Sequence, residues 1–275
     1  MKFFVLALCA VLVGNTRGLA QTPVDRPADR SLFVDSDWYV LGAYAVATVA
    51  MFPLDRHLAS VVRKEDLIAN RDLERASSVF RFFGGIGPYL IGGTMYAVGR
   101  LTKGERAAAL GLHGTEAIVI GQGVSGVLKL ALGRTRPYAA ADTNPHDFSL
   151  GRGLKGADYQ SFPSGHSTTA FAAAAAVQAE TSEWWPHAQW ILRPALYGGA
   201  ALVALSRIYE DKHWASDVVM GSAIGAFAGL KVVRFNHTHE GNRIDRWFLG
   251  AKSQASSIRV IADGSEFGVV VHLAR

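Results

Sequence analysis

Residues 161–179 read SFPSGHSTTAFAAAAAVQA, and this stretch decides the fold class. Ser164 is of a residue type that caps helix N-termini, and Gly165 allows a tight backbone turn next to it. The run that follows is apolar and of helical length. We therefore expect a helix that begins at Ser164 and extends to Ala179.

Five further apolar stretches of helical length flank this one on both sides. Their ranges are Trp38–Pro53, Gly84–Val98, Arg106–Leu132, Trp190–Leu205 and Trp214–Val233. Another segment, Arg56–Phe83, mixes charges with apolar positions, which is typical of a partly exposed amphipathic helix. The sequence therefore predicts an all-α protein, built as a helical bundle of about six core helices.

The first residues differ from this helical middle. Lys2, an apolar run and the small residues before Gln21 form the pattern of a secretory signal peptide over residues 1–20. We expect cleavage after Ala20, and the alternative is an uncleaved anchor. The single cysteine, Cys9, lies inside this segment, so the mature protein would have no disulfide and no thiol chemistry. The protein is therefore expected to be exported, and to be periplasmic or membrane-associated.

The rest of the sequence divides into three parts. Residues 21–37 are polar and contain prolines, which predicts a mobile N-terminal arm. Residues 38–233 hold the helical stretches and form the expected main domain. In the tail, residues 234–275, β-rich runs on either side of Asp263 and Gly264 predict a short C-terminal β-hairpin.

Composition and charge narrow the classes of protein and partner. Hydrophobic residues make up 49% and charged residues 19%, which excludes a disordered or fibrous chain. With 28 Lys and Arg against 23 Asp and Glu, the net charge is +5. This surplus is too small and too dispersed to indicate nucleic-acid binding. It is compatible with an anionic small substrate or an anionic membrane surface.

A first polar cluster, Lys129-x6-Arg136-Pro137, follows the third apolar stretch. If the helix persists, this spacing places Lys129 and Arg136 on one helical face, and Pro137 ends the helix there. Two cations would then converge at the mouth of a helix. The alternative is a pair of ordinary cations at a helix end, with their charges held in water.

A second cluster, Pro163-Ser164-Gly165-His166, stands where the next helix begins. Free backbone N–H groups at a helix start bind anions. His166 lies beside them, placed to donate a proton to a bound anionic group. The alternative is an ordinary capped helix with a surface histidine.

The third cluster is Ser206-Arg207-x5-His213-x3-Asp217. The spacing predicts that His213 and Asp217 share one helical face. A carboxylate can hold one imidazole nitrogen protonated and leave the other free as a base or nucleophile. Arg207 adds a planar, bidentate binder of oxyanions. The alternative is a surface pair at a helix start.

Taken together and in this order, the three clusters resemble the signature motifs of the type 2 phosphatidic acid phosphatase (PAP2) and vanadium haloperoxidase superfamily. The family pattern is Lys-x6-Arg-Pro, then Pro-Ser-Gly-His, then Ser-Arg-x5-His-x3-Asp, and every defining position is matched. The resemblance spans roughly Trp38 to Val233.

This resemblance implies a role for each motif residue. The phosphate group would be held by Lys129, Arg136, Ser164, Gly165 and Arg207. His213 would attack phosphorus and form a phosphohistidine, with Asp217 to orient it. His166 would protonate the leaving oxygen and then help to activate water. Because the cations neutralise the charge of the transition state, no metal or other cofactor is expected.

The expected function is a metal-independent phosphatase that acts on a soluble phosphomonoester or on a lipid phosphate or diphosphate, with vanadate as an inhibitor. One alternative is a haloperoxidase, for which vanadate would be the cofactor. The other is a non-catalytic helical membrane protein whose buried charges serve packing or transport. His237-Thr238-His239 is a short histidine pair in a polar stretch, and the sequence gives no reason to expect a metal there.

The protein is expected to be either a soluble periplasmic helical bundle or a membrane-associated protein in which fewer than six of the apolar stretches cross the bilayer. Family members that cross a bilayer have six spanning helices and a site that faces away from the cytoplasm. With a mature N-terminus outside, six full spans would place the site inside. Trp38–Pro53 and Gly84–Val98 are shorter than the about 20 residues that a span needs, so we expect both to pack as core helices.

Glycine recurs every four residues after the third cluster, at Gly221, Gly225 and Gly229. The three positions form a smooth stripe on one helical face, which predicts close packing against a neighbouring helix. This packing would hold the third cluster near His166.

Overall fold

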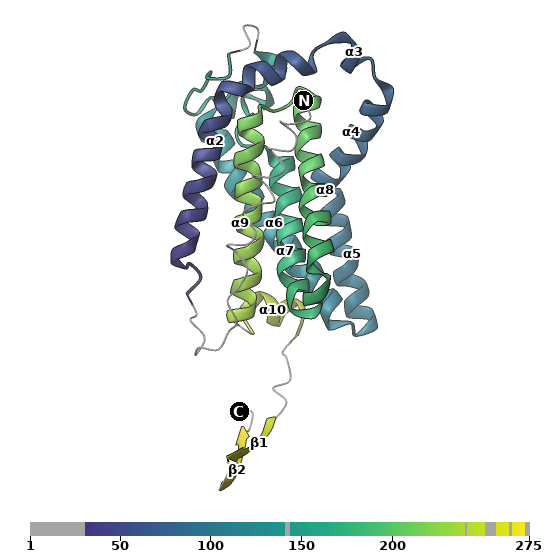
Figure 1. Cartoon of the computed structure of the whole chain (residues 1–275), viewed down its shortest axis with the longest axis vertical. Coiled ribbons are helices and arrows are strands. Elements are labelled where there is room, and N and C mark those ends of the chain that lie inside the picture. The colour runs from purple at the N-terminus through teal and green to yellow at the C-terminus, as the bar shows by residue number, and fades with distance from the viewer. Residues whose placement is uncertain (1–30, 141–143, 240, 251–256, 264–265, 273–275) are drawn as a thin grey trace. The chain divides into compact units, whose positions relative to one another are not determined.

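The structure, a computed structural model, describes residues 31–140, 144–239, 241–250, 257–263 and 266–272. The expected signal peptide, residues 1–20, lies outside the described residues, as does most of the expected N-terminal arm. The described α-helices are α2 (Asp35–Val62), α3 (Glu65–Ile68), α4 (Arg71–Gly84), α5 (Gly87–Thr102), α6 (Glu105–Leu132), α7 (Gly165–Trp184), α8 (Gln189–Tyr209), α9 (Ala215–Thr238) and α10 (Arg243–Phe248). The predicted all-α fold is confirmed (Figure 1).

The chain divides into two compact units, Met1–His239 and Glu240–Arg275. The first unit holds α2 to α9, and the second holds α10 and two strands, β1 (Ser257–Asp263) and β2 (Glu266–His272). The strands pair antiparallel, with Ser257 opposite His272 and Asp263 opposite Glu266. Gly264, at the predicted turn, lies outside the described residues.

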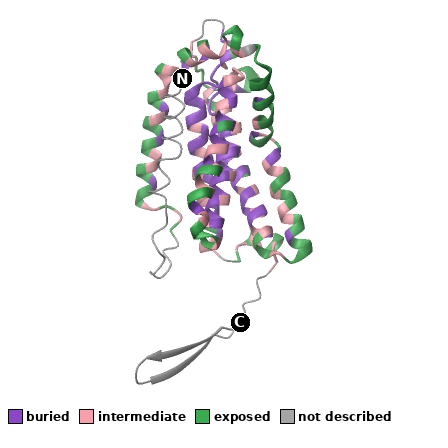
Figure 2. Ribbon diagram, turned by 45° about the vertical axis from the view of Figure 1, so that its right-hand side comes forward, coloured by how far each residue is buried: buried purple, intermediate pink, exposed green. Residues whose placement is uncertain are grey.

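α7 is the central helix of the first unit and packs against α6, α8 and α9. Its buried positions carry mostly small side chains, and Ala172, Ala175 and Ala176 are fully buried. Figure 2 shows the buried residues concentrated in these central helices and the exposed residues on the outer ones. Small side chains allow the helix backbones to approach closely.

The glycine stripe on α9 faces α7. A Cβ atom on Gly221 would lie 2.3 Å from the carbonyl oxygen of Ser164. A Cβ on Gly225 would lie 2.3 Å from the carbonyl oxygen of Thr168, and one on Gly229 would be 2.6 Å from the α7 backbone. The predicted close packing is confirmed, and it brings the start of α9 against the start of α7.

α2 departs from the prediction. Its apolar stretch was expected to end at Pro53, whereas the helix runs from Asp35 through Pro53 to Val62. Pro53 lies on an exposed side of the helix, and Asp55, two residues later, is buried and accepts a hydrogen bond from the backbone N–H of Ser216 at 2.9 Å. This tertiary contact outweighs the cost of a proline inside a helix.

The single amphipathic helix predicted over Arg56–Phe83 is also wrong. Asn70 begins a separate helix, α4, because its side-chain oxygen accepts hydrogen bonds from the N–H groups of Asp72 and Leu73, both at 3.1 Å. An asparagine cap satisfies the N–H groups that a helix start leaves free, so α4 starts there. The chain between α2 and α4 is a corner with the short α3.

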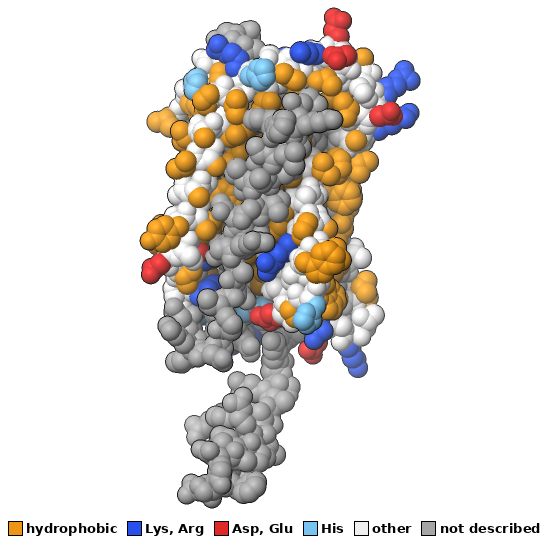
Figure 3. All heavy atoms as spheres, in the orientation of Figure 1, with side chains coloured by type: hydrophobic (Ala, Val, Ile, Leu, Met, Phe, Trp, Pro, Cys, Tyr) orange, Lys and Arg blue, Asp and Glu red, His pale blue; other side chains and the backbone are white. Residues whose placement is uncertain are grey.

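Four described segments are long and apolar enough to cross a membrane, judged by length and composition alone. These are Asp35–Val62, Glu105–Ala139, Pro186–Tyr209 and Ala215–Thr238. α5, with 16 residues, is not among them. Trp38–Pro53 is part of the longer α2, so the stretch is not too short to span and the length argument made for it does not hold. Figure 3 shows hydrophobic side chains spread along the outside of the helices.

Candidate active site

The three motifs meet at one end of the bundle, the upper end in Figure 1. α6 and α8 end there, and α7 and α9 begin there. Two helix N-termini therefore face this end, and each carries a partial positive charge from its unpaired N–H groups. The arrangement favours the binding of an anion.

Lys129 and Arg136 converge, but not along one continuous helix. α6 ends at Leu132, because Gly133 follows in the left-handed conformation, at φ 55°, that favours glycine. The Nζ of Lys129 donates a hydrogen bond to the carbonyl oxygen of Gln160 at 2.7 Å, and the Nη2 of Arg136 reaches the same oxygen at 3.5 Å. The helix thus ends at Leu132, where the apolar stretch was expected to end, and does not persist to Arg136; the loop brings the two cations together instead.

Arg207, near the end of α8, adds a third cation. Its side chain is buried, and its Nη1 donates a hydrogen bond to the Oε2 of Glu210 at 2.6 Å. Its Nε is buried and has no hydrogen-bond partner among the described residues, so it can serve a phosphate oxygen. Glu210 also accepts from the hydroxyl of Ser77 and lies 4.0 Å from the Nη1 of Arg81. Arg81, which none of the three sequence motifs indicates, brings a further cation from α4.

Ser164 is the N-cap of α7, as predicted. Its Oγ accepts a hydrogen bond from the backbone N–H of Ser167 at 3.4 Å. A Cβ atom on Gly165, the next residue, would lie 3.2 Å from the Oε1 of Gln122 and 3.7 Å from the Cε of Lys129. Glycine at this position therefore leaves room between the start of α7 and the nearby cation.

His166 packs against the end of α4. A Cβ atom on Gly84 would lie 2.9 Å from the Cβ of His166 and 2.5 Å from the Cγ1 of Val203. Burial, together with the positive charges of Arg207 and Lys129, lowers the pKa of His166 to about 3. The imidazole is therefore neutral at pH 7 in the free protein.

His213 precedes α9 and is held to its first turn. Trp214 is the N-cap, and the Oδ2 of Asp217 accepts a hydrogen bond from its backbone N–H at 2.9 Å. The same oxygen lies 3.4 Å from the Nδ1 of His213, which precedes the helix, so the pair does not share the predicted helical face. Burial lowers the pKa of His213 to about 3, which leaves the imidazole neutral with a free lone pair.

Arg134, which is not a defining position of any of the three motifs, holds Asp217 in place. Its Nη1 donates to the Oδ1 of Asp217 at 2.5 Å, and its Nη2 donates to the Oδ2 of Asp55 at 2.8 Å. All three side chains are fully buried, and the guanidinium lies 4.8 Å from the ring centre of Phe52. The position of Arg134 just before Arg136 is the only sign of this role in the sequence.

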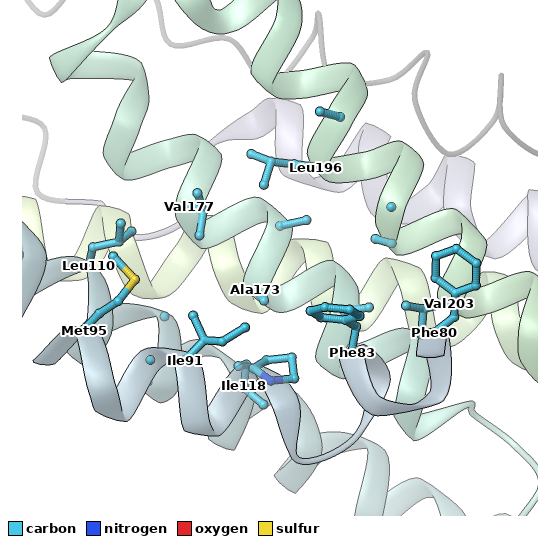
Figure 4. A pocket seen from close by; sticks show the side chains of 18 residues that line it. Phe80, Phe83, Ile91, Met95, Leu110, Ile118, Ala173, Val177, Leu196 and Val203 are labelled. Atoms are coloured by element: carbon cyan, nitrogen blue, oxygen red, sulfur yellow. The ribbon is translucent and has the colours of Figure 1, made fainter. Parts of the chain in front are cut away.

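An apolar cavity of about 410 Å³ lies beside His166. It is lined by side chains of α4, α5, α6, α7 and α8, and Figure 4 shows Phe83, Ile91 and Leu196 around it. Val203 lines the cavity, and the side chains of both Val203 and His166 lie against Gly84. The charged site and a hydrophobic volume are therefore neighbours.

Comparison with known proteins agrees with the motifs. The family model described as PAP2 superfamily matches residues 111–240, which contain all three motifs. A lipid A 1-phosphatase of Porphyromonas gingivalis is 37% identical over 91 residues, covering 31% of this chain and 19% of that protein. An undecaprenyl-diphosphatase of Sulfolobus acidocaldarius is 30% identical over 126 residues, covering 45% of this chain and 57% of that protein. The chain thus spans less than two thirds of either relative.

A solved structure has the same fold. The transmembrane PAP2 type phosphatidylglycerolphosphate phosphatase from Bacillus subtilis superposes with a TM-score of 0.55 at 19% identity, over 75% of this chain and 98% of that chain. The fold and the charged end together define a helical-bundle protein with cationic side chains gathered at one end. More particularly, residues 111–240 match the PAP2 superfamily, as the three motifs indicated.

Proposed function

We propose that this protein is a membrane phosphatase that removes a phosphate group from a lipid through a phosphohistidine on His213. The observation that carries this proposal is the buried, neutral His213 beside Asp217, at the end of the bundle where Lys129, Arg136 and Arg207 gather. A neutral imidazole has the lone pair that a nucleophile needs. The cations and helix N-termini offer the electrostatic stabilisation that phosphoryl transfer requires.

In the first step, the Nε2 of His213 attacks phosphorus and the bond to the lipid oxygen breaks. The Nδ1–H group of His213 donates a hydrogen bond to Asp217, and the carboxylate stabilises the positive charge that develops on the ring. Arg134 holds Asp217 for this task through the Oδ1 contact of 2.5 Å. The three cations take up the negative charge of the phosphoryl oxygens.

His166 protonates the leaving oxygen as that bond breaks. In the free protein this imidazole is neutral, because burial and the neighbouring cations lower its pKa. A bound phosphate group neutralises those cations and raises the pKa of His166, so the substrate itself loads the acid with a proton. In the second step, His166 removes a proton from water, the hydroxide attacks the phosphohistidine, and inorganic phosphate leaves.

A lipid is favoured over a soluble substrate by the apolar cavity of about 410 Å³ beside His166, which offers space for an acyl or isoprenoid chain. The two relatives described above are named for lipid A and for undecaprenyl diphosphate, which are both phosphorylated lipids. Four segments with the length and composition of membrane spans support a substrate that is itself held in a membrane.

Phosphate release from a panel of substrates tests this function. Full-length protein purified in detergent should release phosphate from phosphatidate or a polyprenyl diphosphate, and orthovanadate should inhibit it. His213→Ala should lower turnover by more than about 1,000-fold, whereas His187→Ala, an exposed histidine between α7 and α8, should not change it. Activity that depends on added magnesium or zinc would contradict the mechanism. Halide oxidation with vanadate and peroxide would favour the haloperoxidase alternative.

A further inference from the structure

Three ionisable side chains from three different helices meet at the end of the bundle opposite the candidate active site. The Nδ1 of His113, on α6, lies 2.5 Å from the Oε1 of Glu180, on α7. The Nε2 of His237, on α9, lies 3.1 Å from the Oε2 of the same carboxylate. One carboxylate thus faces two imidazoles, one with each oxygen.

This cluster is separate from the site of the proposed reaction. Glu180 lies about 20 Å along α7 from His166, since an α-helix rises about 1.5 Å per residue. His113 and Glu180 are 4% and 2% exposed, and His237 is half-buried. Because burying a carboxylate is costly, such a group needs a charged or strongly hydrogen-bonded partner.

We propose that His113, Glu180 and His237 bind one divalent transition-metal ion, with Zn²⁺ as the ion that the donor set fits best. Two imidazole nitrogens and one carboxylate oxygen are a known ligand set of four-coordinate zinc, in which water takes the fourth position. One ligand atom from each residue lies within 4.8 Å of the others. At Zn–N and Zn–O bond lengths of about 2.0–2.2 Å, tetrahedral ligand atoms stand about 3.3 Å apart, so shifts of about 1 Å complete the site.

The surroundings of His237 support this assignment. Its other ring nitrogen, Nδ1, lies 3.3 Å from the Oε1 of Glu183. Metal-binding histidines usually donate their second N–H to a carboxylate, which fixes the ring and makes the ligating nitrogen more basic. Glu183 is 55% exposed, so the cluster is close to solvent and an ion can reach it.

Metal binding would join α6, α7 and α9 at this end. The ion would replace the protons now shared between the carboxylate and the imidazoles, and these protons would leave to solvent. Because only the folded bundle brings the three ligands together, bound zinc would stabilise the folded state. The ion would act on the fold and not on the reaction, so this inference does not depend on the proposed function.

The test measures zinc on the full-length protein, purified in detergent with a tag that contains no histidine. After removal of metal with EDTA, the protein is titrated with ZnCl₂ against a chromophoric chelator, and bound zinc is counted by mass spectrometry after gel filtration. We expect one tightly held zinc per chain and a higher Tm with zinc than without. Zinc K-edge X-ray absorption of this sample should show two imidazole ligands with oxygen completing the shell.

Variants then identify the ligands. His113→Asn, Glu180→Gln and His237→Asn should each lose the bound equivalent, and His187→Asn should keep it. Glu183→Gln should weaken zinc binding by about 10- to 100-fold, because it removes only the support of a ligand. Phosphate release, which none of these residues performs, shows whether each variant is folded.

Three results would overturn the proposal, and the first two need no variant. The first is wild-type protein that retains no zinc. The second is an absorption spectrum with fewer than two imidazoles. Equal zinc binding by wild type and a folded His113→Asn would also exclude this site and leave the cluster as a hydrogen-bonded network.

Discussion

At the scale of single residues, the candidate site depends on buried charges that hold one another. Arg134 bridges two carboxylates, Asp217 and Asp55, with all three side chains fully buried. Asp55 also accepts from the backbone N–H of Ser216 at 2.9 Å, so the network joins α2, the loop after α6 and the start of α9. The position of His213 therefore depends, through Asp217 and Arg134, on Asp55 in α2, the first described helix.

Replacing Arg134 with alanine should destabilise the protein strongly. The change leaves two buried carboxylates without their cation, which costs about 3–5 kcal/mol in comparable cases. Thermal unfolding in detergent measures this, and turnover should fall as well because Asp217 loses its anchor. Arg75→Ala, which removes an arginine that is 79% exposed, is the matched control and should change stability by less than about 0.5 kcal/mol. Equal stability of the two variants would contradict a structural role for Arg134.

Stability should also fall with acid because of His213. Its folded pKa of about 3 is below the unfolded value, so the unfolded state binds more protons between pH 3 and about 6.5. The free energy of unfolding should therefore decrease as pH falls through this window, by up to about 1.4 kcal/mol per pH unit for this group. His213→Asn should flatten the dependence, as measured by unfolding at a series of pH values. The exposed His187→Asn should leave the slope unchanged, and a slope unaltered by His213→Asn would count against the low pKa.

At the scale of elements, the site depends on how closely α7 and α9 approach. The glycine stripe of α9 lies directly on the α7 backbone, and Gly221 faces the carbonyl of Ser164, the N-cap of α7. The backbone N–H of Ser164 in turn donates to the carbonyl oxygen of Asp217 at 2.9 Å. The second and third motifs are therefore joined by backbone contacts. A side chain larger than that of glycine at position 221 would push the two backbones apart.

Gly221→Ala should separate these two motifs. Its new methyl group would lie 2.3 Å from the Ser164 carbonyl oxygen, so the helices must move apart, at a cost of about 1–3 kcal/mol. Phosphate release should fall at the same time. Gly198→Ala, on α8, meets nothing within 4 Å and should instead stabilise its helix by about 0.5–1 kcal/mol. Matching effects of the two substitutions would show that helix propensity, and not packing, governs this site.

At the scale of the whole first unit, the candidate site and the start of α2 lie at opposite ends. Asp37, in the first turn of α2, pairs with Lys231 near the end of α9, whereas Asp217 at the site lies in the first turn of α9. If the site faces away from the cytoplasm, α2 begins on the cytoplasmic side. Cleavage after Ala20 with an exported N-terminus would give the reverse orientation. For a chain that spans a membrane, the two predictions exclude each other: either the site faces away from the cytoplasm or the N-terminus is exported after cleavage at Ala20.

Cysteine labelling on intact cells decides the orientation. In a Cys9→Ser background, Asp66→Cys places a thiol at the site end, next to Arg63, which binds Asp211 at 2.9 Å. Lys103→Cys places one at the other end, between α5 and α6. A membrane-impermeant maleimide should label Asp66→Cys on intact cells, and Lys103→Cys only after lysis. The reverse pattern would place the site inside, and labelling of both would exclude a spanning chain.

The sequence by itself determined what depends on neighbouring residues. Ser164 at a helix start, the apolar helical stretches and the three motifs follow from local capping, periodicity and spacing, and they predict the all-α bundle and the PAP2 domain. Where the sequence failed, distant contacts overrode local signals. α2 continues through Pro53 because Asp55 has buried partners near α9, and Lys129 meets Arg136 through the loop at Gln160 and not along one helix face.

Only the tertiary structure decided which distant side chains share a buried space. Long stretches of chain separate Arg134 from Asp55, and also His113 from Glu180 and His237. The residues next to them in the sequence do not predict these contacts. Removing a charged group from water costs free energy, so a buried charge is tolerated only where another part of the chain supplies its partner. These pairs exist only in the packed bundle, because neither of the two chain segments carries both partners.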